Sequence, residues 1–404
     1  MPETPHLARR GVIALAALCA FAVLPASGGE KVLYAFQGHA NDGQTPNGAL
    51  ISDIAGNLYG VTAGGGEDQP GCCGTVFKLA PDGSETVLYA FQSGSDGTDP
   101  NGILAKDNAG NLYGTASGGG GVCQPNVCGA VFRLAPDGTE TILHAFTGGS
   151  DGETPQGGVI ADASGNLYGT AEAGGDLSDC NEAGCGTVFK VAPDGTVTVL
   201  HAFQGSDGWQ PRGTLMMDGS GNLYGTTAMG GNMEDCAGNG CGTVFEVSPD
   251  GTETVLYAFK GSDGETPLGG VIADSAGNLY GTTLYGGASN VGTVFKLAPN
   301  GAESVLHSFQ MSGVDGAEPE AGLIMDNRGD LYGTTFDGGS GCRDGCGTAF
   351  KLTPGSIETI LYAFGQKHGS RPTAALLAGK NGLLYGTTPD GGAKQRGVVF
   401  SVKE

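Results

Sequence analysis

The sequence predicts an all-β protein, a seven-bladed β-propeller of four-stranded antiparallel blades. Three observations predict this fold: the string LYG recurs seven times at spacings of 52 to 56 residues, each copy lies in a unit of four short β-type runs, and the two chain ends hold complementary parts of one unit. With 78 Gly and 19 Pro in 404 residues, the composition argues against long helices. A hydrophobic content of 39% at regular positions argues against disorder.

Each unit predicts four strands joined by tight turns. In the fifth unit the runs are GGVIAD (269–274), NLYGTT (278–283), GTVFKLAP (292–299) and ESVLHSF (303–309). The first two runs are joined by D-x-x-G-N and the last two by P-N-G, which place Gly where a hairpin needs a positive φ. The aspartates that begin the D-x-x-G turns are expected to accept hydrogen bonds from turn amides; they are Asp53, Asp107, Asp162, Asp218, Asp274 and Asp326.

The ends of the chain predict how the ring closes. EKVLYAF (30–36) matches the fourth strand of a unit, and GVVFSVKE (397–404) matches the third. The N-terminal strand should therefore complete the last blade, which leaves no unpaired edge between the first and last blades. An open solenoid, the alternative, has no need of this offset.

The first 28 residues predict a secretory signal peptide. Arg9 and Arg10 precede an apolar run over residues 12–24, and Pro25 and small residues follow it. The run is shorter than the roughly 20 residues that a spanning helix needs, so we expect no membrane span after cleavage. The predicted organisation is a signal peptide at 1–28 and a single seven-repeat propeller domain at 29–404. The mature chain is expected in the periplasm, outside the cell or on its surface.

Ten cysteines lie in pairs in the loop after the LYG strand of five units, whereas units five and seven have shorter loops without cysteine. Because an exported chain meets an oxidising compartment, we expect a local disulfide in each longer loop, with metal-bound thiolates as the alternative. The predicted pairs are Cys72 and Cys73, Cys123 and Cys128, Cys180 and Cys185, Cys236 and Cys241, and Cys342 and Cys346. The adjacent pair would form a strained ring and could instead stay reduced or pair elsewhere.

These motifs resemble a known family. The run GNLYGTTxxGG…GTVFKLxPDGxETVLYAF, repeated over residues 30–404, is similar to the GloVer tandem repeat of secreted bacterial proteins described as choice-of-anchor. The resemblance implies export and a repeat fold, and it brings no established activity. The chain departs from the choice-of-anchor description because it has no recognisable C-terminal anchor.

In an antiparallel meander the cysteine loops and the interblade connections share one face, where we expect any ligand to bind. Six connections carry a D-G step, and their aspartates could form an oxygen-rich ring suited to Ca²⁺, the one cofactor the sequence suggests. These residues are Asp42, Asp96, Asp151, Asp207, Asp263 and Asp315. Turn chemistry is the alternative explanation, and unit seven breaks the pattern with GQKHGSRPT (365–373).

The single tryptophan, Trp209, marks a second candidate site. It lies beside Asp207 and Arg212 in GSDGWQPRG, where the other D-G connections have small, acidic or amide residues. An exposed indole next to a guanidinium and a carboxylate would stack on a sugar ring or anchor a protein. The alternative is an indole that covers the hydrophobic edge of one blade.

The sequence has no HExxH, Walker or dinucleotide motif, and its one GxSxG match (148–152) lies in an interblade connection without a strand-to-helix turn. His144, His201 and His307 occupy a strand position that holds Tyr in other units, so we interpret them as packing variants. A net charge of −23 argues against nucleic-acid binding. We therefore predict a monomeric binding module for a glycan or protein ligand on the cysteine-loop face. The alternatives are a Ca²⁺-dependent hydrolase or lactonase, and a structural surface-layer protein without a discrete ligand.

Overall fold

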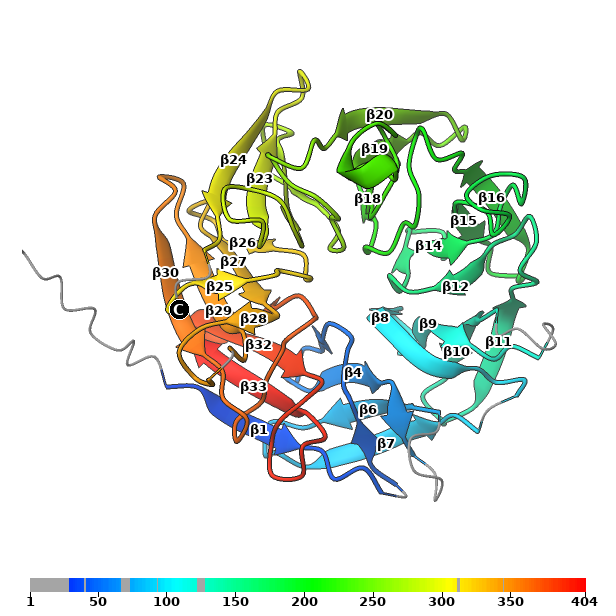
Figure 1. Cartoon of the computed structure of the whole chain (residues 1–404). Coiled ribbons are helices and arrows are strands. Elements are labelled where there is room, and N and C mark those ends of the chain that lie inside the picture. Colours follow the sequence, from blue (N-terminus) through cyan, green and yellow to red (C-terminus); the bar gives the residue numbers. More distant parts are fainter. Residues whose placement is uncertain are drawn as a thin grey trace, which may run out of the picture.

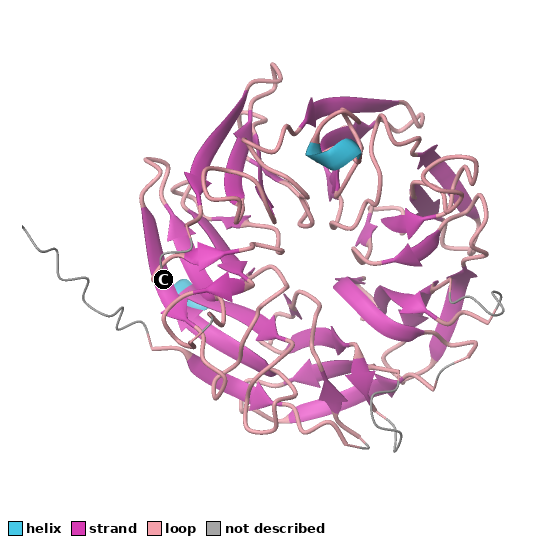
Figure 2. Cartoon of the chain, viewed as in Figure 1, coloured by secondary structure: helices cyan, strands magenta, loops and turns pink. Residues whose placement is uncertain are grey.

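The structure is a computed structural model that describes residues 29–39, 41–66, 73–92, 94–121, 128–310, 313–343 and 345–404. Seven antiparallel sheets surround a central axis (Figure 1), so the chain is a seven-bladed β-propeller, as the sequence predicts. The described residues hold two short 3₁₀-helices, η1 (Cys236–Gly238) and η2 (Lys380–Gly382) (Figure 2). None of the described helices is long and apolar enough to cross a membrane. The predicted signal peptide, Cys72 and Cys123 lie outside the described residues.

Blades one to six run in chain order from the axis to the rim, and the fourth strands of all seven blades follow the rim of the ring (Figure 1). The innermost strands are β3 (Ile51–Ser52), β8 (Thr98–Lys106), β13 (Ile160–Ala161), β17 (Met216–Met217), β21 (Ile272–Ala273), β26 (Ile324–Met325) and β31 (Leu377–Ala378). The second are β4 (Leu58–Thr62), β9 (Leu112–Gly118), β14 (Leu167–Ala173), β18 (Leu223–Thr227), β22 (Leu279–Thr283), β27 (Leu331–Thr335) and β32 (Leu383–Thr388).

The two outer positions complete the blades. The third strands are β6 (Thr75–Leu79), β10 (Ala130–Leu134), β15 (Thr187–Val191), β19 (Thr243–Val247), β23 (Thr293–Leu297), β29 (Thr348–Leu352) and β33 (Val398–Lys403). The fourth are β7 (Glu85–Ala90), β11 (Glu140–Ala145), β16 (Val197–Ala202), β20 (Glu253–Ala258), β24 (Glu303–Ser308), β30 (Glu358–Ala363) and β1 (Lys31–Ala35). Short extra strands pair connections with second-strand loops: β2 (Gly43–Gln44) with β5 (Gly64–Gly65), β12 (Glu153–Pro155) with β14, and β25 (Gly316–Ala317) with β28 (Asp337–Gly338).

The N-terminal strand closes the ring. β1 pairs antiparallel with β33, and the seventh sheet has the order β1, β33, β32, β31. Phe36, directly after β1, is fully buried in a cluster with Leu50 and Phe77 of blade one. The predicted closure is therefore confirmed, and it buries apolar side chains at the junction between the last and first blades.

The hydrophobic core is divided among the seven junctions between blades. At each junction the Phe that follows the fourth strand of one blade contacts the Phe of the third strand of the next blade edge-to-face, with ring centroids 4.8 to 5.3 Å apart. The Gly of each LYG motif makes room for this ring: a Cβ on Gly281 would lie 2.7 Å from the ring of Phe295. The YAF, LYG and VF motifs recur in the sequence because each copy builds the same packed junction between two blades.

The connections between blades are held in an unusual backbone conformation. The residue before the Pro of each connection has a φ between 51° and 59°, which is costly for the β-branched Thr45, Thr154 and Thr266. Its N–H donates to a carbonyl of the loop of the preceding blade at 2.8 to 3.1 Å, as Thr154 does to Cys128. This bond fixes the connection where it turns inward, so the residue after the Pro reaches the axis.

Candidate functional site

A cavity of about 770 Å³ lies on the axis of the ring, and all seven blades line it. Each unit contributes the residue that follows the Pro of its connection, between that constant Pro and a constant Gly or Ala. These residues are Asn47, Asn101, Gln156, Arg212, Leu268, Glu320 and Thr373. A ring of symmetric backbones therefore presents a cation, an acid, amides, a hydroxyl and an apolar side chain to one cavity. Such asymmetry is expected of a ligand site rather than of packing.

Arg212 is the charged centre of this cavity. Its guanidinium forms an ion pair with Glu172 of β14, which also accepts a hydrogen bond from Gln156. The Arg212 side chain is 36% exposed, whereas that of Glu172 is 12% exposed. The Nε of Arg212 is buried and has no hydrogen-bond partner. The partly exposed Arg212 side chain therefore keeps hydrogen-bond donors that Glu172 does not occupy.

Two other side chains of the cavity also leave a buried polar atom unsatisfied. Asn47 donates to the Oδ1 of Asn101, but its own Oδ1 has no partner, and neither does the Oγ1 of Thr373. An unmet buried polar group costs about 1 to 3 kcal/mol, so native sites satisfy such groups with water or ligand atoms. The side chains of Asn47, Arg212 and Thr373 therefore line the cavity with hydrogen-bonding capacity that the described residues leave unused.

Glu320 adds a carboxyl that titrates near neutral pH. Burial raises its pKa to about 7, the charge of Glu318 adds to the rise, and the charge of Arg212 opposes it. Glu320 therefore exchanges a proton at neutral pH. The wall between these polar groups is apolar and is formed by Ile103, Met216, Leu268, Leu323, Ile324 and Leu377, among others.

The structure places Asp207, Trp209 and Arg212, which were predicted to form one ligand site, in different surroundings. Arg212 lines the axial cavity, but Asp207 contacts His201 at the rim. Trp209 is half-buried rather than exposed, and it packs against the core cluster that contains Phe203. The chain turns inward between Asp207 and Arg212, which separates side chains that are neighbours in the sequence.

The D-G aspartates lie at separate junctions between blades. Each accepts a hydrogen bond within its own connection: Asp207 accepts from the N–H of Gln204 at 2.7 Å, and Asp263 accepts from the N–H of Lys260 at 2.8 Å. Each also faces the Tyr or His of the preceding outer strand, as Asp263 does with Tyr257 and Asp207 with His201. The six aspartates predicted to form a Ca²⁺ ring therefore belong to six separate groups.

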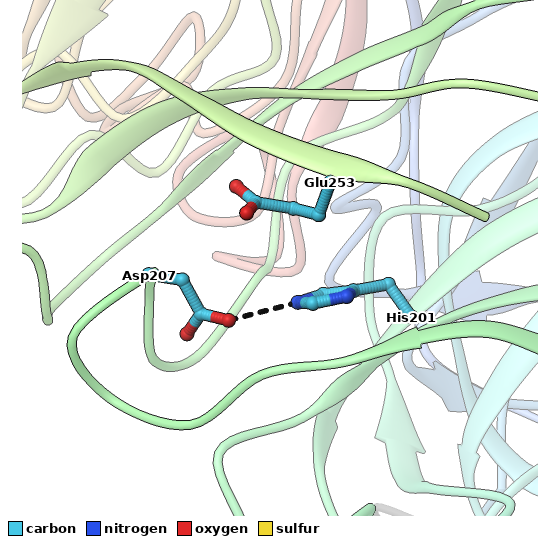
Figure 3. A group of neighbouring side chains, drawn as sticks. All are labelled: His201, Asp207 and Glu253. Atoms are coloured by element: carbon cyan, nitrogen blue, oxygen red, sulfur yellow. Dashed lines mark hydrogen bonds and ion pairs between the residues drawn. The ribbon is translucent and has the colours of Figure 1, made fainter.

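Each of five groups has a third member that was not predicted from the sequence. A glutamate at the start of the next outer strand lies beside the aspartate, and burial, with the charge of that aspartate adding to it, raises its pKa to about 7. The pairs are Asp42 with Glu85, Asp96 with Glu140, Asp207 with Glu253, Asp263 with Glu303, and Asp315 with Glu358. Figure 3 shows His201, Asp207 and Glu253 converging from two outer strands and a connection. The Glu that begins the recurring ETVLYAF run was the sequence feature that could have predicted this third residue.

The predicted disulfides are confirmed wherever both cysteines are described. These bonds join Cys180 to Cys185, Cys236 to Cys241, and Cys342 to Cys346. Cys73 and Cys128 are also disulfide-bonded, while their predicted partners lie outside the described residues. Disulfides in five of the loops are typical of a protein exported to an oxidising compartment.

Comparisons with solved structures agree with the fold. Virginiamycin B lyase from Staphylococcus aureus is 12% identical with a TM-score of 0.59, over 93% of this chain and 100% of that one. The extracellular domain of a one-component system from B. thetaiotaomicron is 13% identical with a TM-score of 0.56, over 93% of this chain and 42% of that one. The extracellular domain of a hybrid two-component system from the same organism has the same TM-score at 15% identity, over 93% and 41%.

The family comparison is more specific than these likenesses. No curated protein matches the sequence. The model of the Gloeobacter/Verrucomicrobia repeat matches residues 19–181 and 124–342, which together span more than half of the chain. The matched segments contain most of the LYG units from which the resemblance to GloVer repeats was drawn. The chain therefore belongs to the Gloeobacter/Verrucomicrobia repeat family.

Proposed function

We propose that the protein is an exported binding module that takes the end of a glycan into its axial cavity. The observation that carries this proposal is the set of different polar side chains that line one cavity: Asn47, Asn101, Gln156, Arg212, Glu320 and Thr373. A sugar carries closely spaced hydroxyls that both donate and accept hydrogen bonds, so it suits a cavity lined by amide, hydroxyl, carboxyl and guanidinium groups. The apolar wall supports the C–H faces of the same sugar rings.

The size of the cavity favours a glycan over a protein ligand. A volume of about 770 Å³ lies within the range of about 300 to 1,000 Å³ that is typical of small-molecule sites. A protein ligand would instead spread over the cysteine loops outside the cavity. Disulfides in those loops support export, for which the predicted signal peptide at residues 1–28 would be responsible.

A glycan array probed with the mature, disulfide-intact protein tests this proposal, followed by calorimetric titration of the strongest glycan. Arg212→Met keeps the length of the side chain but removes the guanidinium, so we expect affinity to fall about 10-fold or more. Arg371→Met is the matched control, because Arg371 occupies a connection of the same design and is 49% exposed. Equal affinity of both variants would place the glycan outside the cavity, and the Trp209→Ala variant would then test the connection surface.

A hydrolase or lactonase acting in the same cavity is the second candidate. Glu320 favours it, because a carboxyl with a pKa of about 7 can serve as a general acid at neutral pH. Incubation of the bound glycan and of simple lactones, with and without Ca²⁺, would reveal products. Glu320→Gln should abolish turnover and leave binding intact. Binding without turnover would support the binding module alone.

A further inference from the structure

Among the residues that the structure describes, two of the blade junctions at the rim carry a complete set of metal-ligating side chains. His201, Asp207 and Glu253 form one set, and His307, Asp315 and Glu358 form the other; within each set the ligand atoms all lie within 4.8 Å of one another. We propose that each set binds one divalent transition-metal ion, with Zn²⁺ as the representative, and thereby links two blades. This inference concerns the rim and does not depend on the proposed glycan site.

The His307 set has the spacing that an ion requires. The Nε2 of His307 lies 3.6 Å from the Oδ2 of Asp315 and 3.8 Å from the Oε2 of Glu358, which is too far for hydrogen bonds. This Nε2 is buried and has no hydrogen-bond partner. Atoms that each lie about 2 Å from one Zn²⁺ ion are about 3 to 4 Å apart. The ion would therefore fit between the three side chains and satisfy the imidazole nitrogen.

The second set has the same three residue types, but its imidazole and aspartate lie closer together. The Nε2 of His201 and the Oδ2 of Asp207 are 2.9 Å apart, and the Oε1 of Glu253 is buried without a hydrogen-bond partner (Figure 3). The N–H of Gln204 holds the other carboxylate oxygen of Asp207 at 2.7 Å, which orients the carboxylate toward the imidazole. An ion would replace the proton that His201 and Asp207 share.

The chemistry of the ligands selects the class of metal. An imidazole nitrogen with two carboxylates suits Zn²⁺ and neighbouring first-row ions, whereas Ca²⁺ prefers oxygen ligands alone. In each set the His lies on the outer strand of one blade, β16 or β24, and the Glu lies on that of the next blade, β20 or β30. Binding would therefore add a metal bridge between the outer strands of two neighbouring blades.

Other junctions provide internal controls for this inference. Three hold Tyr in place of His with the same two carboxylates: Tyr34 with Asp42 and Glu85, Tyr89 with Asp96 and Glu140, and Tyr257 with Asp263 and Glu303. His144 lies 3.0 Å from Asp151, but unit three has Val197 at the strand position of the Glu. A junction therefore accepts either Tyr or His, so His→Tyr variants are expected to fold.

Titration of the chelator-treated mature protein with Co²⁺, read by its visible absorption, and with Zn²⁺, read by calorimetry, tests the inference. We expect two equivalents to bind and the melting temperature to rise with metal. His307→Tyr should leave one equivalent, and the double variant His201→Tyr with His307→Tyr should leave none. The matched control His144→Tyr should still bind two. Val197→Glu should create a third site beside His144 and Asp151.

Two results would overturn the inference. Absence of binding to the wild type would mean that the sets are polar contacts between blades and nothing more. Two equivalents in the double variant would place the metal at other residues. Circular dichroism of each variant verifies that a lost equivalent reflects a lost ligand rather than a lost fold.

Discussion

A partly buried glutamate at the blade junctions makes stability depend on pH. Burial, with the neighbouring aspartate adding to it, raises the pKa of Glu85, Glu140 and Glu303 from the usual 4.5 to about 7. The folded chain therefore keeps protons that the unfolded chain releases between these values. This contribution to stability is fully present below about pH 4.5 and is lost as the pH rises through 7. We expect metal-free protein to melt at a higher temperature at pH 5 than at pH 8.

Thermal melts followed by circular dichroism at the two pH values measure this effect. The turn aspartates do not interfere: although burial opposes the shift, hydrogen bonds from Asn111 and Tyr113 lower the pKa of Asp107, so it stays ionised in this range. A triple variant with Gln at Glu85, Glu140 and Glu303 should show a smaller difference. A wild type that melts at the same temperature at both pH values would contradict the assignment.

Single residues were predictable where their role is local. The turn role of Asp274 is confirmed, because it accepts hydrogen bonds from the N–H groups of Ala276 and Asn278. The packing role of His201 is confirmed as well, since its ring contacts Phe203 edge-to-face as Tyr257 does Phe259. The proximity of His201 to Glu253 was not predictable. The repeat period shows which strand a residue belongs to, but it does not show which residue of the next blade lies beside it.

At the scale of elements, the disulfides shape loops rather than hold blades together. The N–H of Gln210 donates to the carbonyl of Cys185, yet in the cysteine-free fifth unit the N–H of Glu318 makes the same bond to Val291 at 2.8 Å. We therefore expect the double variant Cys180→Ser with Cys185→Ser to remain folded. Its stability should fall by no more than about 2 kcal/mol, as expected for a short closed loop.

Urea denaturation of the oxidised wild type and of this double variant measures the loss. Failure of the variant to fold would mean that the disulfide does more than shape its loop. The cysteine pairing was predictable because length and cysteine content vary together in these loops. The inward turn of each connection was not, because it depends on a left-handed residue before Pro, such as Thr154, which sequence propensity disfavours.

That inward turn also explains why only one of the polar cavity residues was predicted from the sequence to bind a ligand. Arg212 was singled out beside Trp209, but Asn47, Glu320 and Thr373 were not. The signal was present in the sequence, since the residue after each connection Pro varies while its neighbours stay constant. Only the fold reveals that these seven variable positions meet on one axis.

At the scale of the whole molecule, the closing junction should be as tight as the others. Phe36 and Phe203 are both fully buried and contact Phe77 and Phe245 at 5.2 and 5.1 Å. We expect Phe36→Ala and Phe203→Ala each to lower the free energy of unfolding by about 3 to 5 kcal/mol. Denaturant unfolding of both variants makes the comparison. A much smaller loss for Phe36→Ala would show that the N-terminal strand does not seal the ring.

We propose that the axial cavity, and not the outer surface, binds the ligand. Ala49 and Ala375 line this cavity and are half-buried, so a larger side chain at either position would project into it and narrow it. The most direct test is calorimetric titration of Ala375→Phe with the glycan that binds the wild type. We predict weakened binding at an unchanged melting temperature. Undiminished affinity in the narrowed cavity would contradict this proposal.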